Sequence, residues 1–341
     1  MNELSPKKLT AKDFATDQEV RWCPGCGDYA ILKAVQKTLA DIEATPENTV
    51  FISGIGCSSR FPYYMETYGF HTIHGRAPAF ATGVKLANPD LDVWLVTGDG
   101  DGLSIGGNHM LHVLRRNVDI QILLFNNEIY GLTKGQYSPT SRPGTRSPSS
   151  PTGSIEQNLN PCAFALGSGA RFIARIVDTD LKRMPNILIR AQQHKGASFI
   201  EIFQNCIVFN DKVFAEFTEK ASAKTRQLFV EDGQPMVFGP DSAFGIRQSP
   251  NGIALEVVNM EADGVSVDDL IVHNEKDHLL ATMLVNQAGI DDFPFVLGVI
   301  YCDPMSSYDS NVSAQVTEAQ EKSPNADMKE LLFAGNTWSV S

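Results

Sequence analysis

Short apolar runs alternate with amphipathic segments along the first 210 residues of the chain. Continuous apolar runs are typical of strands buried on both faces of a parallel sheet. The sequence predicts five such strands, at residues 50–52, 93–96, 120–125, 171–177 and 199–203. Apolar residues with helical spacing predict helices at residues 28–42, 104–116, 161–167 and 179–194. This alternation predicts an α/β fold, with a mostly parallel sheet flanked by helices.

The same pattern divides the chain into three parts. Residues 1–22 are polar and predict an N-terminal arm, and residues 23–230 form the predicted α/β domain. Residues 231–341 predict an irregular acidic C-terminal extension, with a late strand at 295–301. Residues 137–158 are rich in Ser, Thr, Pro and Gly. They form either a flexible surface loop or, since loops of this length are often functional, part of a site.

Charge is also distributed unevenly along the chain. The chain has 28 Lys and Arg residues against 40 Asp and Glu residues, which gives a formal net charge of −12. Residues 1–210 hold 20 of the basic and 19 of the acidic residues, so the remaining 8 and 21 give residues 211–341 a charge of −13. This acidity argues against nucleic acid or an anionic membrane as the main partner, because both select basic surfaces. The sequence contains no apolar run of about 18 residues and no secretory signal, so we expect a cytoplasmic protein.

Two turns with candidate ligands follow neighbouring predicted strands. One strand runs into the sequence GDGDG at residues 98–102, and the next runs into NNEIYG at residues 126–131. The carboxyl ends of parallel strands meet at one edge of a sheet, where ligands bind. Glycines let the backbone approach a diphosphate. Asp99 and Asn127 offer the oxygen ligands that Mg²⁺ prefers.

The first turn matches neither of two common ligand loops. The dinucleotide fingerprint GxGxxG fails because its sixth position is Leu103, and the EF-hand loop fails because the twelfth position from Asp99 is Met110. However, GDG followed by 25 residues and then NN resembles the thiamine diphosphate (TPP) motif of TPP enzymes. That resemblance implies that Mg²⁺ is held by Asp99, Asn127 and the backbone carbonyl of Ile129.

Six cysteines provide a second set of candidate ligands. The segment WCPGCG holds Cys23 and Cys26 at a spacing shared by zinc sites, redox dithiols and iron–sulfur clusters. Cys57 and Cys206 each follow a predicted strand. Four thiolates at scattered positions suit a [4Fe–4S] cluster, although from spacing alone Cys302 competes with Cys206 for the fourth position.

Five segments together resemble the β subunits of the 2-oxoacid:ferredoxin oxidoreductases. They are WCPGCGDYAIL (22–32), GIGCSSR (54–60), HTIHGRAPAFATGVKLA (71–87), GDGDGLSIGGNH (98–109) and NNEIYGLTKGQYSPTS (126–141). The resemblance implies a TPP-binding fold that holds TPP, Mg²⁺ and one [4Fe–4S] cluster. The cluster ligands that it implies are Cys23, Cys26, Cys57 and Cys206. The TPP-site residues that it implies are Ile55, Gly56, Cys57, Ser58, His74, Gly75, Arg76, Ala77, Gly100, Asp101, Gly131 and Leu132.

The resemblance also implies a reaction. Members of the family oxidatively decarboxylate a 2-oxoacid to an acyl-CoA and CO₂ and pass the electrons through the cluster to ferredoxin, and the reaction can run in reverse. An α subunit supplies the Glu that activates TPP, so we expect this chain to be active only with an α subunit. Arg60, Leu132 and Lys134 match members that use 2-oxoglutarate. A second substrate carboxylate needs a further cation, so these residues favour 2-oxoglutarate, converted to succinyl-CoA, over pyruvate or another 2-oxoacid.

Two other functions stay open at this point. Cys23 and Cys26 also suit a non-enzymatic module that binds structural Zn²⁺. An ordinary TPP decarboxylase without electron transfer is the other, and the four placed cysteines argue against it. Ferredoxins are commonly acidic, so we expect that the acidic extension does not form their docking face.

Overall fold

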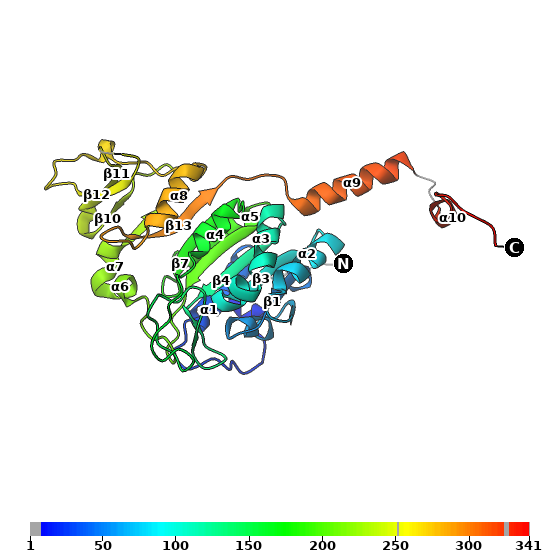
Figure 1. The fold of residues 1–341 in the computed structure, drawn as a ribbon, viewed down its shortest axis with the longest axis horizontal. Helices are drawn as coiled ribbons and strands as arrows, with labels where there is room; N and C mark the ends of the chain where they lie inside the picture. Colours follow the sequence, from blue (N-terminus) through cyan, green and yellow to red (C-terminus); the bar gives the residue numbers. More distant parts are fainter. Residues whose placement is uncertain (1–7, 251, 324–326, 341) are drawn as a thin grey trace, which may run out of the picture.

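The computed structural model describes residues 8–250, 252–323 and 327–340 and contains one sheet of eight strands at its centre (Figure 1). The strands are β1 (Thr49–Ser53), β2 (Tyr68–His71), β3 (Asp92–Gly98), β4 (Gln121–Asn126), β7 (Phe172–Val177), β8 (Ser198–Phe203), β9 (Gln227–Val230) and β13 (Phe295–Cys302). Their order is β2-β1-β3-β4-β8-β7-β13-β9, and only β13 and β7 pair antiparallel. The predicted α/β fold is confirmed, since β1, β3, β4, β7 and β8 are the five predicted strands.

Helices cover both faces of this sheet (Figure 1). On one face, α1 (Asp28–Asp41) and α5 (Met184–Gln193) bury their apolar side chains against residues such as Phe51 and Trp94. The opposite face is covered by α2 (Ala77–Ala87), α3 (Gly107–Arg116), α4 (Pro161–Gly167) and α8 (His278–Gln287). The strands between these layers are therefore buried on both sides, as their continuous apolar sequences predict.

Two helices begin later than the sequence predicts. The helix predicted from residue 179 begins at Met184, because Pro185 suits the first turn of a helix and not its interior. The helix predicted from residue 104 begins at Gly107, after a π-helical turn at Asp101–Ile105. That turn begins within the GDGDG segment, shortly after the end of β3.

The described part of the predicted N-terminal arm, residues 8–22, lies against the α/β domain. The Phe14 side chain is fully buried, and its carbonyl accepts a hydrogen bond from the Glu66 amide at 2.9 Å. Trp22 is also buried and contacts Tyr29 and Tyr64 edge-on. The aromatic contacts fix the start of the CxxC segment. Residues 1–7 lie outside the described residues.

The C-terminal extension is folded, so the expectation that it is irregular is wrong. It contains a small antiparallel sheet of β10 (Val237–Phe238), β11 (Phe244–Gln248) and β12 (Leu255–Asn259), followed by α8 and then β13 in the main sheet. These strands are short and partly exposed, so they leave no clear alternation in the sequence. The division at residue 230 stays a prediction, although the main sheet takes β13 from beyond it.

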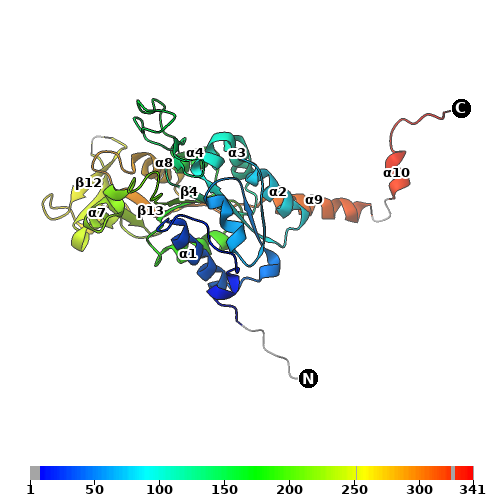
Figure 2. The same cartoon turned by 90° about the horizontal axis from the view of Figure 1, so that it is seen from below.

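The remaining elements connect or extend this core. The short strands β5 (Ile129–Tyr130) and β6 (Gln136–Tyr137) form a hairpin, while α6 (Ala215–Thr218) and α7 (Lys220–Arg226) precede β9. At the other end, α9 (Tyr308–Lys322) and α10 (Met328–Leu332) extend away from the sheet (Figures 1 and 2). Among the described residues, none of the helices has both the length and the apolar composition needed to cross a bilayer.

Candidate active site

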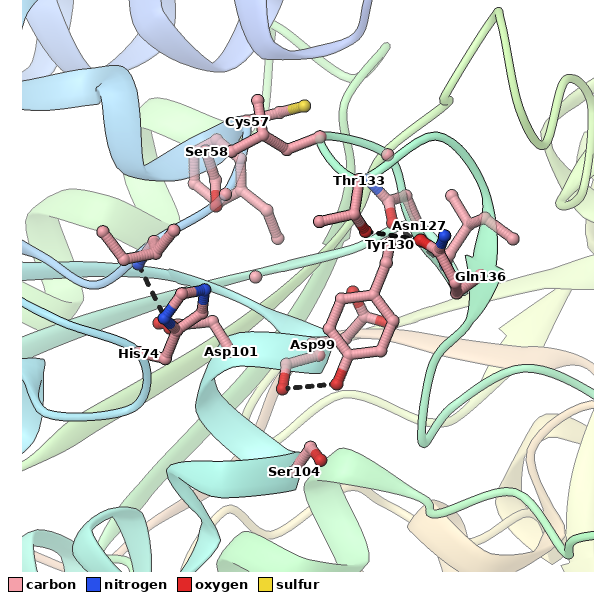
Figure 3. A pocket seen from close by; sticks show the side chains of 18 of the residues that line it. Cys57, Ser58, His74, Asp99, Asp101, Ser104, Asn127, Tyr130, Thr133 and Gln136 are labelled. Carbon is pink, nitrogen blue, oxygen red and sulfur yellow. Dashed lines mark hydrogen bonds between the residues drawn. The ribbon is translucent and has the colours of Figure 1, made fainter. Parts of the chain in front are cut away.

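A cavity of about 420 Å³ lies at the carboxyl ends of β1, β3 and β4 (Figure 3), and we call it the strand-end pocket. The predicted site residues that line it are Ile55, Gly56, Cys57, Ser58, His74, Asp99, Gly100, Asp101, Asn127, Ile129, Gly131 and Leu132. Three residues predicted for the same site, Gly75, Arg76 and Ala77, do not line it. The lining also includes residues that the sequence did not single out, namely Gly98, Ser104, Ile105, Phe125, Tyr130, Thr133 and Gln136.

Asp99 is the buried carboxylate of this pocket. Its Oδ2 accepts hydrogen bonds from Ser138 Oγ at 2.5 Å and Thr140 Oγ1 at 2.6 Å. Burial raises the pKa of the Asp99 carboxyl to about 6, and these hydroxyl donors oppose that rise. Because both donors are neutral, the ionised carboxylate keeps the negative charge that a cation requires.

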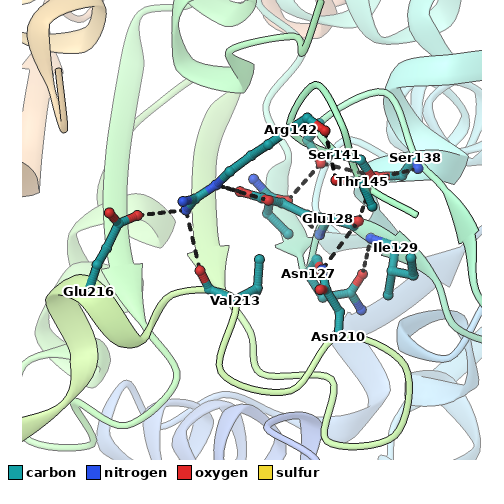
Figure 4. Close-up of polar contacts among 12 residues, drawn as sticks. Asn127, Glu128, Ile129, Ser138, Ser141, Arg142, Thr145, Asn210, Val213 and Glu216 are labelled. Atoms are coloured by element: carbon teal, nitrogen blue, oxygen red, sulfur yellow. Dashed lines mark hydrogen bonds and ion pairs between the residues drawn. The ribbon is translucent and has the colours of Figure 1, made fainter. Parts of the chain in front are cut away.

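Asn127 and Ile129 supply two further oxygens beside Asp99. The Asn127 amide accepts a hydrogen bond from the Ile129 amide at 3.2 Å through its Oδ1 (Figure 4). Its backbone carbonyl accepts one from Asn210 Nδ2 at 2.9 Å. The turn after β4 is thus held from both sides. A carboxylate, an amide oxygen and a carbonyl oxygen are ligands that Mg²⁺ takes.

The loop after β6, which lies within the Ser-, Thr-, Pro- and Gly-rich residues 137–158, packs onto this turn. Ser141 Oγ donates to the Glu128 carbonyl at 2.5 Å, and Arg142 forms ion pairs with Glu128 at 3.3 Å and Glu216 at 2.7 Å (Figure 4). Burial raises the pKa of Glu128 to about 7, although Arg142 opposes that rise. The sequence marked this loop only by its composition, and the hydroxyls of Ser138 and Thr140 could have been suspected from the SPTS segment alone.

Asp101 ties two loops together beneath the pocket. Its Oδ1 accepts hydrogen bonds from the backbone amides of Ile55 at 3.1 Å and Gly75 at 2.8 Å, and its Oδ2 accepts one from Thr97 Oγ1 at 2.6 Å. A Cβ on Gly54 would lie 1.9 Å from this carboxylate, so that position requires glycine. Asp101 therefore holds together the two loops that carry Ile55 and His74.

Gly100, in the GDGDG turn, packs closely against the Tyr130 ring. A Cβ on Gly100 would lie 2.2 Å from the Tyr130 ring, and the Tyr130 hydroxyl donates to the Gly100 carbonyl at 3.1 Å. The buried Asp99 carboxylate and the oxygens of Asn127 and Ile129 fit Mg²⁺ bound with a diphosphate. The chemistry of the donor set thus agrees with the TPP motif.

A second cavity, of about 230 Å³, contains all four predicted cluster cysteines, and we call it the cysteine pocket. Its lining includes Cys23, Cys26, Cys57 and Cys206, with the apolar segment Ile207, Val208 and Phe209 at its border. Cys302 is absent from the lining, and its sulfur lies 3.9 Å from His194 Nδ1. The structure therefore favours Cys206 over Cys302 as the fourth thiol.

The four thiols line one cavity, as a shared cluster requires. Burial raises the pKa of the Cys57 thiol to about 12 and raises that of Cys26 further. Such thiols lose their protons when a metal binds the sulfur in place of the proton. Within the described residues, no three His, Cys, Asp or Glu side chains converge on one ion position. A [4Fe–4S] cluster takes one thiolate for each iron and does not need that convergence.

Of the three predicted substrate residues, one belongs to both pockets. Leu132 lines both cavities and its side chain is 52% exposed. Arg60 and Lys134 line the cysteine pocket beside Leu132 and not the strand-end pocket. Arg60 Nε donates to the Tyr64 hydroxyl at 3.0 Å, which fixes the start of its guanidinium. Gln204, which the sequence did not single out, also lies here and contacts both Asn127 and Cys26.

Comparison with known proteins agrees with the TPP motif at the strand-end pocket. Residues 54–202 match the family of the thiamine pyrophosphate enzyme C-terminal TPP-binding domain. Over 335 residues the chain is 48% identical to 2-oxoglutarate oxidoreductase subunit KorB of Mycobacterium tuberculosis. This match covers 96% of this chain and 88% of the relative. It is also 48% identical over 204 residues to subunit beta of 2-oxoacid:ferredoxin oxidoreductase 1 of Aeropyrum pernix, covering 60% and 64% of the two chains.

A solved structure extends this similarity to the whole fold. The chain superimposes with a TM-score of 0.78 and 30% identity on a chain of the 2-oxoglutarate:ferredoxin oxidoreductase of Magnetococcus marinus, determined with 2-oxoglutarate, coenzyme A and succinyl-CoA bound. The match covers 97% of both chains. Sequence identity, coverage and site geometry lead to one conclusion: the chain belongs to the β subunits of the 2-oxoacid:ferredoxin oxidoreductases.

Proposed function

We propose that this β subunit, together with an α subunit, converts 2-oxoglutarate and CoA reversibly to succinyl-CoA and CO₂ and passes the electrons to ferredoxin. The observation that carries the proposal is the wall shared by the two pockets. Cys57, Asn127, Gly131 and Leu132 line both of them. A site that releases electrons beside a site that accepts them suits oxidative decarboxylation.

The strand-end pocket is proposed to hold Mg²⁺ and TPP. Asp99, Asn127 and the carbonyl of Ile129 would hold the ion, and the glycine turn would admit the diphosphate. When bound, TPP supplies the stabilisation of a carbanion that decarboxylation of a 2-oxoacid requires. The chain itself positions the ligands, because Asp101 fixes the loops that carry Ile55 and His74 beside the pocket.

The cysteine pocket is proposed to hold a [4Fe–4S] cluster on Cys23, Cys26, Cys57 and Cys206. When bound, such a cluster accepts electrons one at a time. The chain fixes the ligands: Trp22 Nε1 donates to the Cys57 carbonyl at 2.7 Å. Thiolate ligands persist in a reducing compartment, so we propose that the enzyme works in the cytoplasm.

Arg60 and Lys134 are proposed to select 2-oxoglutarate. The M. tuberculosis relative is named for 2-oxoglutarate, and the M. marinus structure contains that substrate. Both cations line the cysteine pocket together with Leu132, which also lines the strand-end pocket. A guanidinium binds a carboxylate through two parallel hydrogen bonds, so Arg60 suits the second carboxylate that pyruvate lacks.

The test is anaerobic co-purification with the α subunit, followed by assays of 2-oxoglutarate and pyruvate with CoA and ferredoxin. We expect Arg60→Gln to lower kcat/KM for 2-oxoglutarate about 10- to 100-fold, the value of a charge-assisted hydrogen bond, with pyruvate unaffected. Arg146→Gln, in the exposed loop, is the matched control. An equal loss with pyruvate would contradict the substrate assignment, and a colourless protein that carries zinc would contradict the enzyme.

A further inference from the structure

Gln204 joins the strand-end pocket to the cysteine pocket. It follows β8 directly and is 1% exposed. Its Oε1 accepts a hydrogen bond from Asn127 Nδ2 at 2.7 Å, and its Nε2 donates one to Cys26 Sγ at 3.3 Å. A single buried side chain therefore contacts one proposed Mg²⁺ ligand and one proposed cluster ligand.

The direction of these hydrogen bonds is fixed along the whole path. The Ile129 amide donates to Asn127 Oδ1 at 3.2 Å, so the Asn127 NH₂ group must face Gln204. The Gln204 carbonyl oxygen then faces Asn127, and its NH₂ group faces Cys26. The second N–H of that group is used as well, because Nε2 donates to the Asn205 carbonyl at 2.5 Å. Rotating either amide would place like groups against each other.

Each end of Gln204 has a physical consequence. An N–H aimed at a cysteine sulfur stabilises the more negative state of a cluster that the sulfur ligates, and hydrogen bonds to the sulfurs are one of the factors that set cluster potentials. An acceptor that holds the NH₂ group of a metal-ligating amide fixes the position of its oxygen. Glutamine combines acceptor and donor in one terminal group. Glutamate keeps only the acceptor, and methionine has neither.

We propose that Gln204 is a positioning residue for both cofactors. It orients the Asn127 oxygen for Mg²⁺, and through Cys26 it raises the reduction potential of the cluster. The proposal rests on the proposed function for the presence of Mg²⁺, TPP and the cluster. Gln204 lines the cysteine pocket and not the strand-end pocket, which it reaches through Asn127.

Two variants separate the two effects in the anaerobic αβ enzyme. Gln204→Met removes both contacts, so the Mg²⁺ concentration that half-saturates TPP binding rises about tenfold or more, and the equilibrium constant for cluster reduction falls about tenfold, which is 59 mV for one electron. Gln204→Glu keeps the acceptor for Asn127, so Mg²⁺ dependence stays within about threefold of the wild type. Its carboxylate faces the Cys26 sulfur, so the potential falls at least as far as in Gln204→Met.

Calorimetry of TPP binding at stepped Mg²⁺ concentrations and redox titration followed by electron paramagnetic resonance measure the two quantities. Gln193→Glu is the matched control, because it adds the same charge at the exposed end of α5, which leads to the start of β8 at the opposite edge of the sheet. If Gln204→Met fails to fold, Gln204→Glu carries the test, because it has the same shape. Potentials equal to the wild type in the folded variants would overturn the proposal. A wild-type enzyme without a [4Fe–4S] signal would instead contradict the proposed function.

Discussion

The residues up to 210 and the residues beyond them contribute differently to one fold: the first line both pockets, and the second extend the main sheet. Every residue that lines the strand-end pocket or the cysteine pocket precedes residue 210. The later residues carry the charge of −13 and contribute β9 and β13 to the edge of the main sheet. The first region carries the residues proposed for the chemistry, and the second completes the main sheet. The charge of the sequence distinguishes the two regions. In the structure, β9 and β13 join the second region to the main sheet of the first.

The difference in charge has a physical reason. TPP, CoA, a 2-oxoacid and an acidic ferredoxin are all anions, so a region of +1 is a better environment for them than a region of −13. Arg60 and Lys134 stand beside the cysteine pocket. In contrast, pairs such as Asp291 and Asp292 lie exposed in the extension. The predictions below test this comparison, from the largest expected effect to the smallest.

Cys206→Ala should abolish electron output and nothing else. Removing one of four thiolates leaves an iron without its protein ligand, so we expect loss of the broad visible absorption and ferredoxin reduction at background. TPP binding should stay within about threefold of the wild type, because Cys206 does not line the strand-end pocket. Absorption spectroscopy and calorimetry of the anaerobic enzyme measure both.

Cys302→Ala is the matched control from the later region. This cysteine ends β13, and the polar partner of its sulfur is His194. We expect an unchanged spectrum and unchanged activity. A colourless Cys302→Ala protein beside a coloured Cys206→Ala protein would reverse the assignment of chemistry to the first region.

Gly298→Ala should destabilise the fold while leaving the chemistry intact. Gly298 lies in β13 with φ +100°, and a Cβ there would lie 2.5 Å from the Val230 carbonyl oxygen of β9. Strain of this kind costs roughly 1–3 kcal/mol, so Tm should fall by several degrees in calorimetry. The cluster spectrum at low temperature should not change. Gly83→Ala on the exposed side of α2 is the control, since nothing lies within 4 Å of its Cβ, and it should gain up to about 1 kcal/mol.

The strand ends were predictable because parallel strands bring them to one edge. Asp99 and Asn127 follow β3 and β4, which pair in parallel, so a linear pattern of apolar runs was enough to place them together. The same reasoning placed Cys206 after β8 beside β4. These positions depend on sheet geometry alone.

Other parts of the site depend on paths that periodicity does not encode. Ser138 and Thr140 reach Asp99 through a loop whose course follows from its own hydrogen bonds. Gln204 was overlooked because a lone glutamine has no motif. The inward direction of Asp101 depends on three donors from separate segments. The pairing of β13 with β7 joins residues more than a hundred positions apart, so its sequence predicted a strand but not its place.

Acid should destabilise the region beyond residue 210 through His273. Its Nε2 lies 3.0 Å from the Val299 carbonyl of β13, and burial lowers the pKa of the ring below the usual value, more than that hydrogen bond raises it. The unfolded chain therefore takes up a proton at a higher pH than the folded chain. The stability that His273 contributes is complete above the ordinary histidine pKa of about 6.5 and is lost as the pH falls below it. Tm should decline from pH 7 to pH 5.5.

His273→Gln sharpens this prediction, because the amide can still donate to Val299 and does not titrate. Its Tm should depend less on pH over the same range. The pKa of His194 is also lowered by burial, so part of the slope will remain. A variant with the full wild-type slope would assign the acid sensitivity to other groups.

The smallest effect is expected when acidic side chains are removed from the region beyond residue 210. This change compares the charges of the two regions most directly. Asp291→Asn with Asp292→Asn removes two exposed charges from the loop between α8 and β13, and asparagine tolerates the positive φ of residue 291. If ferredoxin docks beside the cysteine pocket, these charges only repel it at long range, so its KM should stay equal or fall by up to about twofold, and only at low salt. Arg21→Gln, which removes a cation that lines the cysteine pocket, should instead raise that KM. A higher KM in the Asp variant would mean that the extension attracts ferredoxin, and the acidic region would then take part in electron transfer as well as in the fold.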